Sequence, residues 1–417
     1  MTRPAIEVLP ILDGLSRRFS RPLYWLFGLT CLCGYLNPFP LKFHSEMQPW
    51  PLFGGGLVFF SLLARRSLPP ASVNLLLIAT GFASLYFAAG GWTLLGIRGF
   101  YNYVALYLIV VSSWAWIREY EGDFLRFLMV ALFAFVGVAL LQATILPGFS
   151  GAWLSRSDTA RLTVRGVCSL FSEPSYFGLA LLLLLGALHV LRPRNRWFAV
   201  VSVGAILFLS RAPIAVLFLA FYLVCLGFSK HPRAALCLLS LTGVALFLLT
   251  IGGYGYHFVP DDPGDDGLRL TRFFKMLVSD PVGQLTSDVS TNQRLSHIFL
   301  SLHGFWDGFP GGQGFAAFSK FYSLHVSEWR PFIFVFFPMD RVMSGYGSAL
   351  FELGLAGTLV PISFLWCARS GSPADRRARL PQFLLLLTLP WMALPLAFPW
   401  LGILVGALAG HRPKNLG

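Results

Sequence analysis

The sequence predicts an all-α polytopic membrane protein of about 12 transmembrane helices, with one large, partly helical loop on the non-cytoplasmic side. Of its 417 residues, 56% are hydrophobic and only 12% are charged. A soluble globular protein carries about 25% charged residues, so this chain has too few charges to cover a water-facing surface. Apolar runs fill most of the chain at about 20 residues per crossing. Basic residues gather in the short connections between these runs, as the positive-inside rule requires.

Residues 1–252 contain nine apolar runs separated by short polar or proline-containing connections. Each run predicts one transmembrane helix. The predicted helices are 22–36, 50–64, 71–90, 100–117, 124–145, 174–191, 197–210, 212–228 and 234–252.

Residues 253–345 are predicted to form a cap on the membrane domain. A connection of this length is far longer than a normal link between helices and is usually functional or disordered. Its content of Phe, Trp and Leu, as in HIFLSLHGFW, argues against disorder. We therefore expect a folded, partly helical loop.

The last part of the chain, residues 346–417, is predicted to hold three helices, at 346–367, 380–395 and 398–410. Pro390, Pro395 and Pro399 are compatible with one long kinked helix or with two short ones. A basic tail that must stay in the cytoplasm favours two.

The placement of the basic residues predicts that both termini lie in the cytoplasm. With that orientation, Arg17 and Arg18 share a side with Arg192, Arg194 and Arg196, and a shift of one helix would separate them. The net charge of +13 is therefore explained by topology, and nucleic acid is not an expected partner. The expected partner is the lipid bilayer.

Charged residues near the bilayer are costly and are candidates for function. Arg165 and Glu173 lie in the non-cytoplasmic segment 146–173, and Glu173 comes directly before Pro174, which suits the first turn of a helix. A capping role for Glu173 is the simpler interpretation. Arg211 lies in a very short non-cytoplasmic connection, where snorkelling to lipid phosphate is the simpler interpretation.

Two further segments carry candidate residues. An amphipathic helix is expected to contain Arg294 and to end in a glycine-rich turn with Gly312 and Gly314. Glu352 lies in an apolar context at the start of the predicted helix 346–367, where a packing or hydrogen-bonding role is the alternative.

The sequence predicts no metal site and no cofactor. It has no Walker loop, no zinc motif and no G-x-S-x-G turn. An acidic patch at residues 261–266 is typical of a solvated turn. His297, His303 and His325 lack ligand spacing and are interpreted as ordinary loop histidines. The six cysteines indicate no disulfide framework.

Taken in order, these segments resemble the O-antigen polymerase and O-antigen ligase superfamily of bacterial envelope-polysaccharide enzymes. RGVCSLFSEPSYFG is similar to the family's R-x-x-G/S-x-F-x-E/N-P segment, and LSRAPIA to its S-R-x-x segment. NQRLSHIFLSLHGFWDGFPGGQGFAAF resembles the large-loop R…P-x-x-G-x-G pattern, and FELGLAG the E-x-G-x-x-G of the next helix. The resemblance covers about residues 160–360.

The resemblance implies a glycosyltransferase of the bacterial inner membrane that acts on undecaprenyl-diphosphate-linked glycans at the periplasmic face. Arginines hold phosphate bidentately and stay charged at any relevant pH. Arg211 and Arg294, with Arg165, are therefore expected to bind the diphosphate in place of a metal ion. Glu173 is the expected general base. Gly312, Gly314 and Glu352 are expected to bind substrate, and a chain-length regulator is a further implied partner.

Two features bear on the branch of the family. Many ligases, and some polymerases, carry a His-Asn pair nine residues before the last motif's glutamate, but this chain has Met343 and Ser344 there. Glutamate before Pro174 also favours a polymerase. The alternatives left open are a ligase that moves finished glycan to lipid A core or another acceptor, and a non-enzymatic transporter of lipid-linked glycan.

Overall fold

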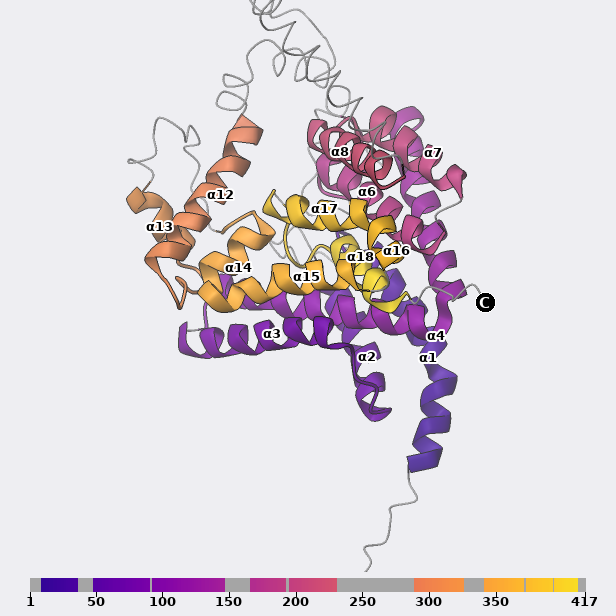
Figure 1. Ribbon diagram of the computed structural model, residues 1–417, viewed down its shortest axis with the longest axis horizontal. Coiled ribbons are helices and arrows are strands. Elements are labelled where there is room, and N and C mark those ends of the chain that lie inside the picture. The colour runs from indigo at the N-terminus through magenta and orange to yellow at the C-terminus, as the bar shows by residue number, and fades with distance from the viewer. Residues whose placement is uncertain are drawn as a thin grey trace, which may run out of the picture.

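The structure, a computed structural model, describes most of the chain as helices (Figure 1). The described residues are 9–36, 48–90, 92–146, 166–192, 195–230, 289–325, 341–370, 373–392 and 394–411. Over these residues there is no β-strand, which confirms the predicted all-α class.

Four helical segments of the described part are long and apolar enough to cross a membrane. They are α3 (Ala71–Gly90), α4 (Leu94–Thr144), α6 (Pro174–Leu191) and the segment Gly345–Arg369. Five shorter apolar helices accompany them. These helices indicate a lipid bilayer environment, whereas the figure of about 12 crossings stays a prediction.

Among the N-terminal helices, α1 differs from the prediction in length. Helix α1 (Leu9–Leu32) begins well before residue 22, and α2 (Trp50–Ala64) has the predicted bounds. The predicted helices 100–117 and 124–145 are both present, and they join end to end in α4 at a kink, where Tyr120 has a non-helical backbone (φ −144°, ψ 59°). The break between them falls in the charged segment 118–123, where the sequence predicts a gap between helices.

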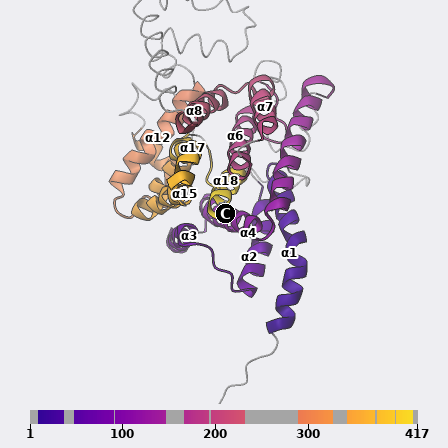
Figure 2. The ribbon, with the colours of Figure 1, turned by 45° about the vertical axis from the view of Figure 1, so that its right-hand side comes forward.

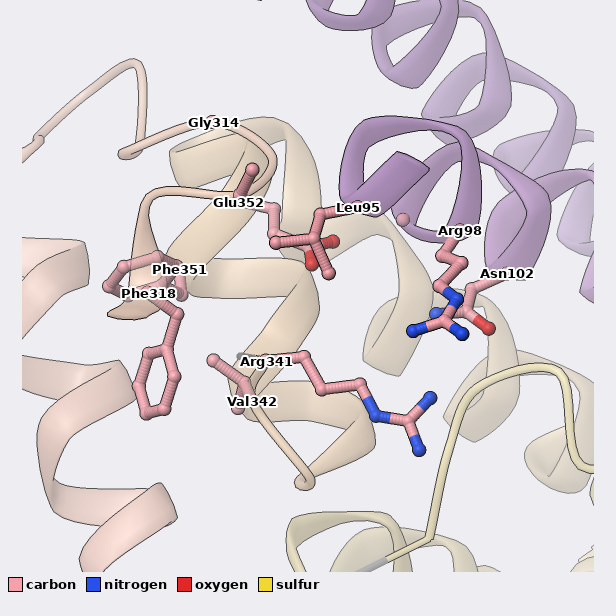
Figure 3. Close-up of a pocket in the computed structure, with 11 residues that line it drawn as sticks. Leu95, Arg98, Asn102, Gly314, Phe318, Arg341, Val342, Phe351 and Glu352 are labelled. Carbon is pink, nitrogen blue, oxygen red and sulfur yellow. The ribbon is translucent and has the colours of Figure 1, made fainter. Parts of the chain in front are cut away.

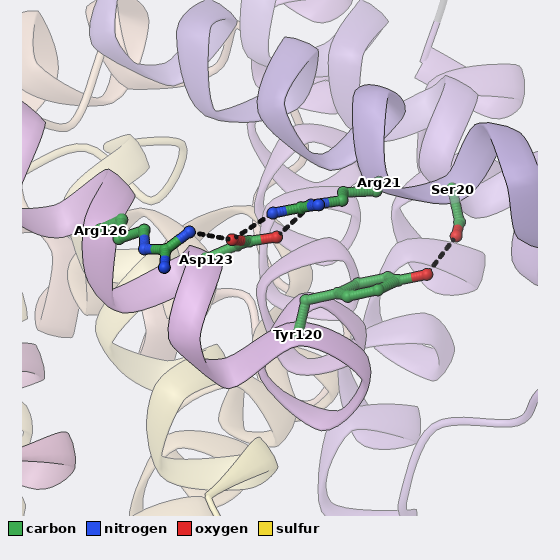
Figure 4. Close-up of polar contacts among 5 residues, drawn as sticks. All are labelled: Ser20, Arg21, Tyr120, Asp123 and Arg126. Atoms are coloured by element: carbon green, nitrogen blue, oxygen red, sulfur yellow. Dashed lines mark hydrogen bonds and ion pairs between the residues drawn. The ribbon is translucent and has the colours of Figure 1, made fainter.

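The kink in α4 is held by α1 (Figure 4). The Arg21 guanidinium donates two hydrogen bonds to the Asp123 carboxylate, from Nε at 2.5 Å and from Nη2 at 2.9 Å. Arg126 adds a contact of 3.3 Å to the same carboxylate, and the Ser20 and Tyr120 hydroxyls lie 3.0 Å apart. A charged connection in the sequence is therefore an ordered contact between two helices.

The middle of the chain forms α6, α7 (Arg196–Gly204) and α8 (Pro213–Lys230). Helix α6 begins at Pro174, as predicted. Helix α7 continues into a π-helical turn, η2 (Ala205–Ser210), and Arg211 is the capping residue that follows it. The predicted helix 234–252 lies outside the described residues.

Within the predicted cap, the structure describes α12 (Val289–Asp307) and α13 (Phe318–His325). Helix α12 matches the amphipathic helix expected around Arg294, and a turn rich in glycine follows it. Residues 253–288 and 326–340 lie outside the described part. That the cap is periplasmic remains a prediction.

The predicted helix 346–367 is interrupted. It consists of α14 (Gly345–Leu353), the 3₁₀ turn η3 (Gly354–Thr358) and α15 (Leu359–Arg369). The short α16 (Pro373–Ala378) follows. Helices α17 (Leu380–Thr388), extended by the 3₁₀ turn η4 (Leu389–Trp391), and α18 (Pro399–Gly410) are the two short elements predicted from the prolines.

Helix α18 lies in the middle of the bundle, with α12 on one side and α1 on the other (Figures 1 and 2). It packs so closely against α4 that a Cβ atom on Gly406 would lie 2.8 Å from the carbonyl oxygen of Val110. The glycine makes this close approach possible. The Trp400 ring stacks on Phe127, with centroids 6.0 Å apart, and meets the edge of Phe135 at 5.0 Å. This packing forms the core, while the first turns of α4 extend toward α14 and the cap.

Candidate functional site

The glycine-rich turn after α12 docks against the break between α14 and η3. Gly312 and Gly354 have φ angles of +79° and +56°, which non-glycine residues rarely adopt. A Cβ atom on Gly312 would lie only 2.4 Å from the Gly354 amide nitrogen. The Gly314 amide donates a 3.1 Å hydrogen bond to the Glu352 carbonyl. The two glycine motifs predicted from the sequence therefore meet, and the role shown for Gly312 is close backbone packing.

The start of α4 packs against the same turn. Thr93 caps the helix by accepting a 3.0 Å hydrogen bond from the Gly96 amide. A Cβ atom on Gly99 would lie 2.4 Å from the Phe315 ring. The Tyr86 hydroxyl of α3 donates to the Gly311 carbonyl. The start of α4, the glycine-rich turn and the region of α14 are distant in sequence, and together they enclose one small space.

This space is a cavity of about 30 Å³, which has room for about one water molecule. Its polar lining side chains are Arg98 and Asn102 from α4, Arg341 from the segment before α14, and Glu352 from α14. The guanidinium groups of Arg98 and Arg341 are directed into the same region from different elements (Figure 3). Its apolar side chains are those of Leu95, Ala316, Phe318, Val342 and Phe351.

Glu352 is positioned by a contact with α4. Its Oε2 atom accepts a 2.8 Å hydrogen bond from the hydroxyl of Tyr103, which is itself fully buried. The Glu352 side chain is half-buried, so its charge is poorly hydrated. One carboxylate and two guanidinium groups at one pocket form an arrangement suited to binding an anionic group next to a proton acceptor.

Neither Arg98 nor Arg341 was among the residues selected from the sequence. The signal that selected Arg211 was arginine on the side of the membrane that the positive-inside rule leaves poor in arginine. The predicted topology puts Arg98, just before the helix 100–117, on that side as well. Arg341 ends the large loop, and no motif distinguishes it from that loop's other basic residues.

The segments of Glu173 and Arg211 form a second group. The Ser210 hydroxyl donates a 2.8 Å hydrogen bond to the Pro174 carbonyl, which joins the two segments directly. Arg211 has a left-handed backbone (φ 51°), a conformation that non-glycine residues adopt at an energetic cost. Its Nε atom donates a 2.9 Å hydrogen bond to the Phe208 carbonyl. The π-helical turn before it is a feature that recurs at functional sites.

Glu173 occupies the N-cap position of α6, and its backbone is extended there. The side chain makes no capping hydrogen bond to the helix backbone. Its Oε2 atom instead accepts a 3.0 Å hydrogen bond from the Ser175 hydroxyl. The position agrees with the simple capping interpretation, but the contact of the carboxylate does not.

The remaining predicted site residues are divided between locations. Arg294 is half-buried on α12, and Arg165 lies outside the described residues. Glu173, Arg211 and Arg294 are not among the residues that line the cavity, whereas Gly314 and Glu352 are. The structure therefore joins the glycine motifs with two further arginines, and joins the segment of Glu173 with that of Arg211.

His297 of α12 has a structural role next to the cavity. Its ring is buried and stacks on Phe318, with centroids 5.3 Å apart. Its Nδ1 atom accepts a 3.3 Å hydrogen bond from the Met343 amide. Burial, with a smaller contribution from the Arg341 charge, lowers the pKa of His297 to about 3. The neutral ring therefore ties α12 to the segment that carries Arg341.

Two findings complete the description of the site. Within the described ranges, no group of three or more His, Cys, Asp and Glu side chains is placed to hold a metal ion. No protein-family model matches the chain, and no curated protein matches it.

Proposed function

We propose that this chain is a membrane glycosyltransferase that polymerises oligosaccharide repeat units linked to undecaprenyl diphosphate, at the periplasmic face of the bacterial inner membrane. The observation that carries the proposal is the convergence of Arg98 and Arg341 in one pocket beside Glu352. The order of the four motifs along the sequence supports the same class of reaction.

Arg98 and Arg341 fit the leaving group of such a reaction. A guanidinium group binds phosphate oxygens bidentately and stays charged at all relevant pH values. Because the cavity holds only about 30 Å³, we place the diphosphate at its mouth, across the two guanidinium groups. A preorganised donor of this kind contributes about 3–4 kcal/mol, or roughly a hundredfold to a thousandfold in rate, to the transition state.

In the proposed reaction, the hydroxyl oxygen of the acceptor sugar forms a bond to C1 of the donor's reducing-end sugar. The bond between C1 and the diphosphate oxygen breaks, and the lipid diphosphate leaves with the electron pair. The hydroxyl proton passes to a carboxylate. Glu352 is the carboxylate that lines the pocket, whereas the earlier choice, Glu173, lies in the second group.

The pocket that contains Arg98 and Arg341 is called the arginine pocket, and its role in binding the diphosphate is tested by the variants Arg98→Lys and Arg341→Lys. Lysine keeps the charge but cannot bind phosphate bidentately, so each variant should lose about a hundredfold or more in polymer extension while still accumulating in the membrane. The measurement is the length distribution of surface glycan on gels, in cells whose own copy of the gene has been deleted. Arg376→Lys, at an exposed position on α16, is the matched control and should leave chain length unchanged.

Normal chain length in both pocket variants would remove the basis of the proposal. The same gels separate polymerase from ligase. Loss of a polymerase leaves single repeat units on the acceptor. Loss of a ligase leaves unmodified acceptor, and polymer accumulates on the lipid carrier.

A further inference from the structure

A second and much larger cavity lies away from the proposed catalytic pocket, between α4, the C-terminal end of α6 and the start of α7. Its volume is about 840 Å³. Leu125 and Met129, just after the kink of α4, form one apolar wall, and Leu191 and Phe198 extend it. Arg192 and Arg196 also line it. It is therefore an apolar groove with two cationic side chains.

The cationic part of the groove is suited to an anion. Arg192 and Arg196 are both exposed. Arg192 caps the C-terminal end of α6, and Arg196 is the first residue of α7. The Asn195 side chain caps α7 by accepting a 3.1 Å hydrogen bond from the Trp197 amide, which fixes the start of the helix beside the arginines. The positive end of the α7 dipole lies at Arg196 and adds to its charge, while Arg192 lies at the negative end of the α6 dipole.

The aromatic side chains indicate that the groove lies at a membrane–water boundary. Trp197 lines it and is 76% exposed, and Val200 on the next turn is also exposed. Tryptophan concentrates at the headgroup level of bilayers, because one end of its ring is apolar and the other can donate a hydrogen bond. The arginines therefore lie at headgroup depth, and the apolar walls lie next to them.

We propose that this groove binds one anionic phospholipid. Its phosphate is held by Arg192 and Arg196, and its acyl chains lie along Leu125, Met129 and Phe198. A phospholipid is favoured over a free anion because the arginines line the same cavity as continuous apolar walls, which a free anion would leave in contact with water. Basic pockets between transmembrane helices are a recognised kind of site for anionic headgroups. This proposal needs only the membrane location and does not depend on glycan transfer.

The test uses the full-length protein, purified in detergent and titrated with phosphatidylglycerol or with phosphatidylcholine. Bound lipid is counted by native mass spectrometry. Each arginine should contribute about fivefold to affinity, so Arg192→Gln/Arg196→Gln should retain about 25-fold less phosphatidylglycerol. Met129→Trp adds bulk to the apolar wall that the acyl chains contact and leaves both arginines, and it should also weaken lipid binding. The control, Arg376→Gln/Arg377→Gln on α16, removes the same charge elsewhere and should bind as the parent does.

Three results would overturn the proposal. The first is equal retention of phosphatidylglycerol by the parent and the arginine variant. The second is equal retention of phosphatidylcholine by the parent. The third is displacement of the lipid by millimolar inorganic phosphate together with normal binding by Met129→Trp, which would identify a free-anion site. Thermal unfolding without lipid, similar for all variants, shows that each still folds.

Discussion

The Glu352 carboxylate accepts a hydrogen bond from Tyr103, and this contact makes two roles for the residue separable. A glutamine side chain has the same shape, and its amide oxygen can accept the same hydrogen bond. What it cannot do is take a proton from an acceptor sugar. A structural role and a catalytic role therefore predict different results for the same substitution.

Glu352→Gln is expected to lower the rate of glycan extension by about a hundredfold or more, the usual contribution of a general base. Its melting temperature should stay close to that of the parent, since the contact to Tyr103 is kept. The rate is measured with purified protein and lipid-linked repeat units. Glu173→Gln is the comparison, and it should retain most activity because its carboxylate contacts Ser175 outside the pocket. The reverse order of severity would make Glu173 the base, as the sequence alone suggested.

His297 gives a prediction about pH. Its pKa is about 3 in the folded protein, whereas an unperturbed histidine has a pKa near 6.5. Between these values the unfolded chain binds a proton that the folded chain does not, so the free energy of unfolding falls as pH falls. The loss is at most about 1.4 kcal/mol per pH unit. His297→Gln, which cannot titrate, should show a shallower fall in melting temperature between pH 7 and pH 5. Equal slopes would mean that His297 is accessible to protons when folded.

Individual residues show where inference from sequence stops. Glu352 and Gly314, which were both selected from their sequence motifs, line one pocket, while their expected role in substrate binding stays a prediction. Arg98 was missed because a single arginine before a helix carries no motif, and only its position on the predicted non-cytoplasmic side distinguishes it. His297 was interpreted as a loop histidine, because the sequence does not show that Phe318 and Met343 surround it.

At the scale of elements, the break between α14 and α15 determines the shape of the site. A regular helix over 345–369 would leave no place for the glycine-rich turn, whose backbone approaches Gly354 and Glu352 directly. The two positive φ angles at Gly312 and Gly354 make this approach possible. The turn and the break are therefore expected to form together, and a side chain at either glycine should disturb both.

Gly312→Ala tests this coupling. A left-handed backbone costs an alanine about 1–2 kcal/mol, and the Cβ atom would lie 2.4 Å from the Gly354 amide, so the turn must shift. We expect a lower melting temperature and loss of glycan extension. Gly56→Ala in α2 is the control, because nothing lies within 4 Å of its added Cβ atom and alanine favours a helix by up to about 1 kcal/mol. Similar results for both variants would show that the turn tolerates a side chain.

Helix existence was predictable because apolar runs are long and proline marks their starts, as at Pro174 and Pro399. Interruptions were predictable only where charged residues mark them, as at Tyr120 between the predicted helices 100–117 and 124–145. The 3₁₀ turn at Gly354 depends on contacts with other helices, and the periodicity of one segment does not predict it. The π-helical turn before Arg211 is a similar case.

At the scale of the whole molecule, the packing of α18 against α4 and α6 explains how an apolar chain acquires one defined interior. Small residues on α18 allow close approach, and Trp400, Phe127 and Phe135 fill the space beside them. The class of fold followed from the composition and from the length of the apolar runs. The side of the membrane on which each pocket lies follows only from the distribution of basic residues, and it is the least direct link between fold and function.

Two cysteine substitutions test that orientation. Trp306→Cys places a thiol on α12, where the parent side chain is 68% exposed, and Arg376→Cys places one at an exposed position of α16. If the positive-inside assignment is right, a membrane-impermeant maleimide added to cells with a permeabilised outer membrane labels the first variant. The second is labelled only after the inner membrane is disrupted. The parent chain measures labelling of the native cysteines and is subtracted. Labelling in the opposite order would put the cap and the arginine pocket in the cytosol, where no periplasmic glycan could reach Arg98, and glycan transfer as proposed would be excluded.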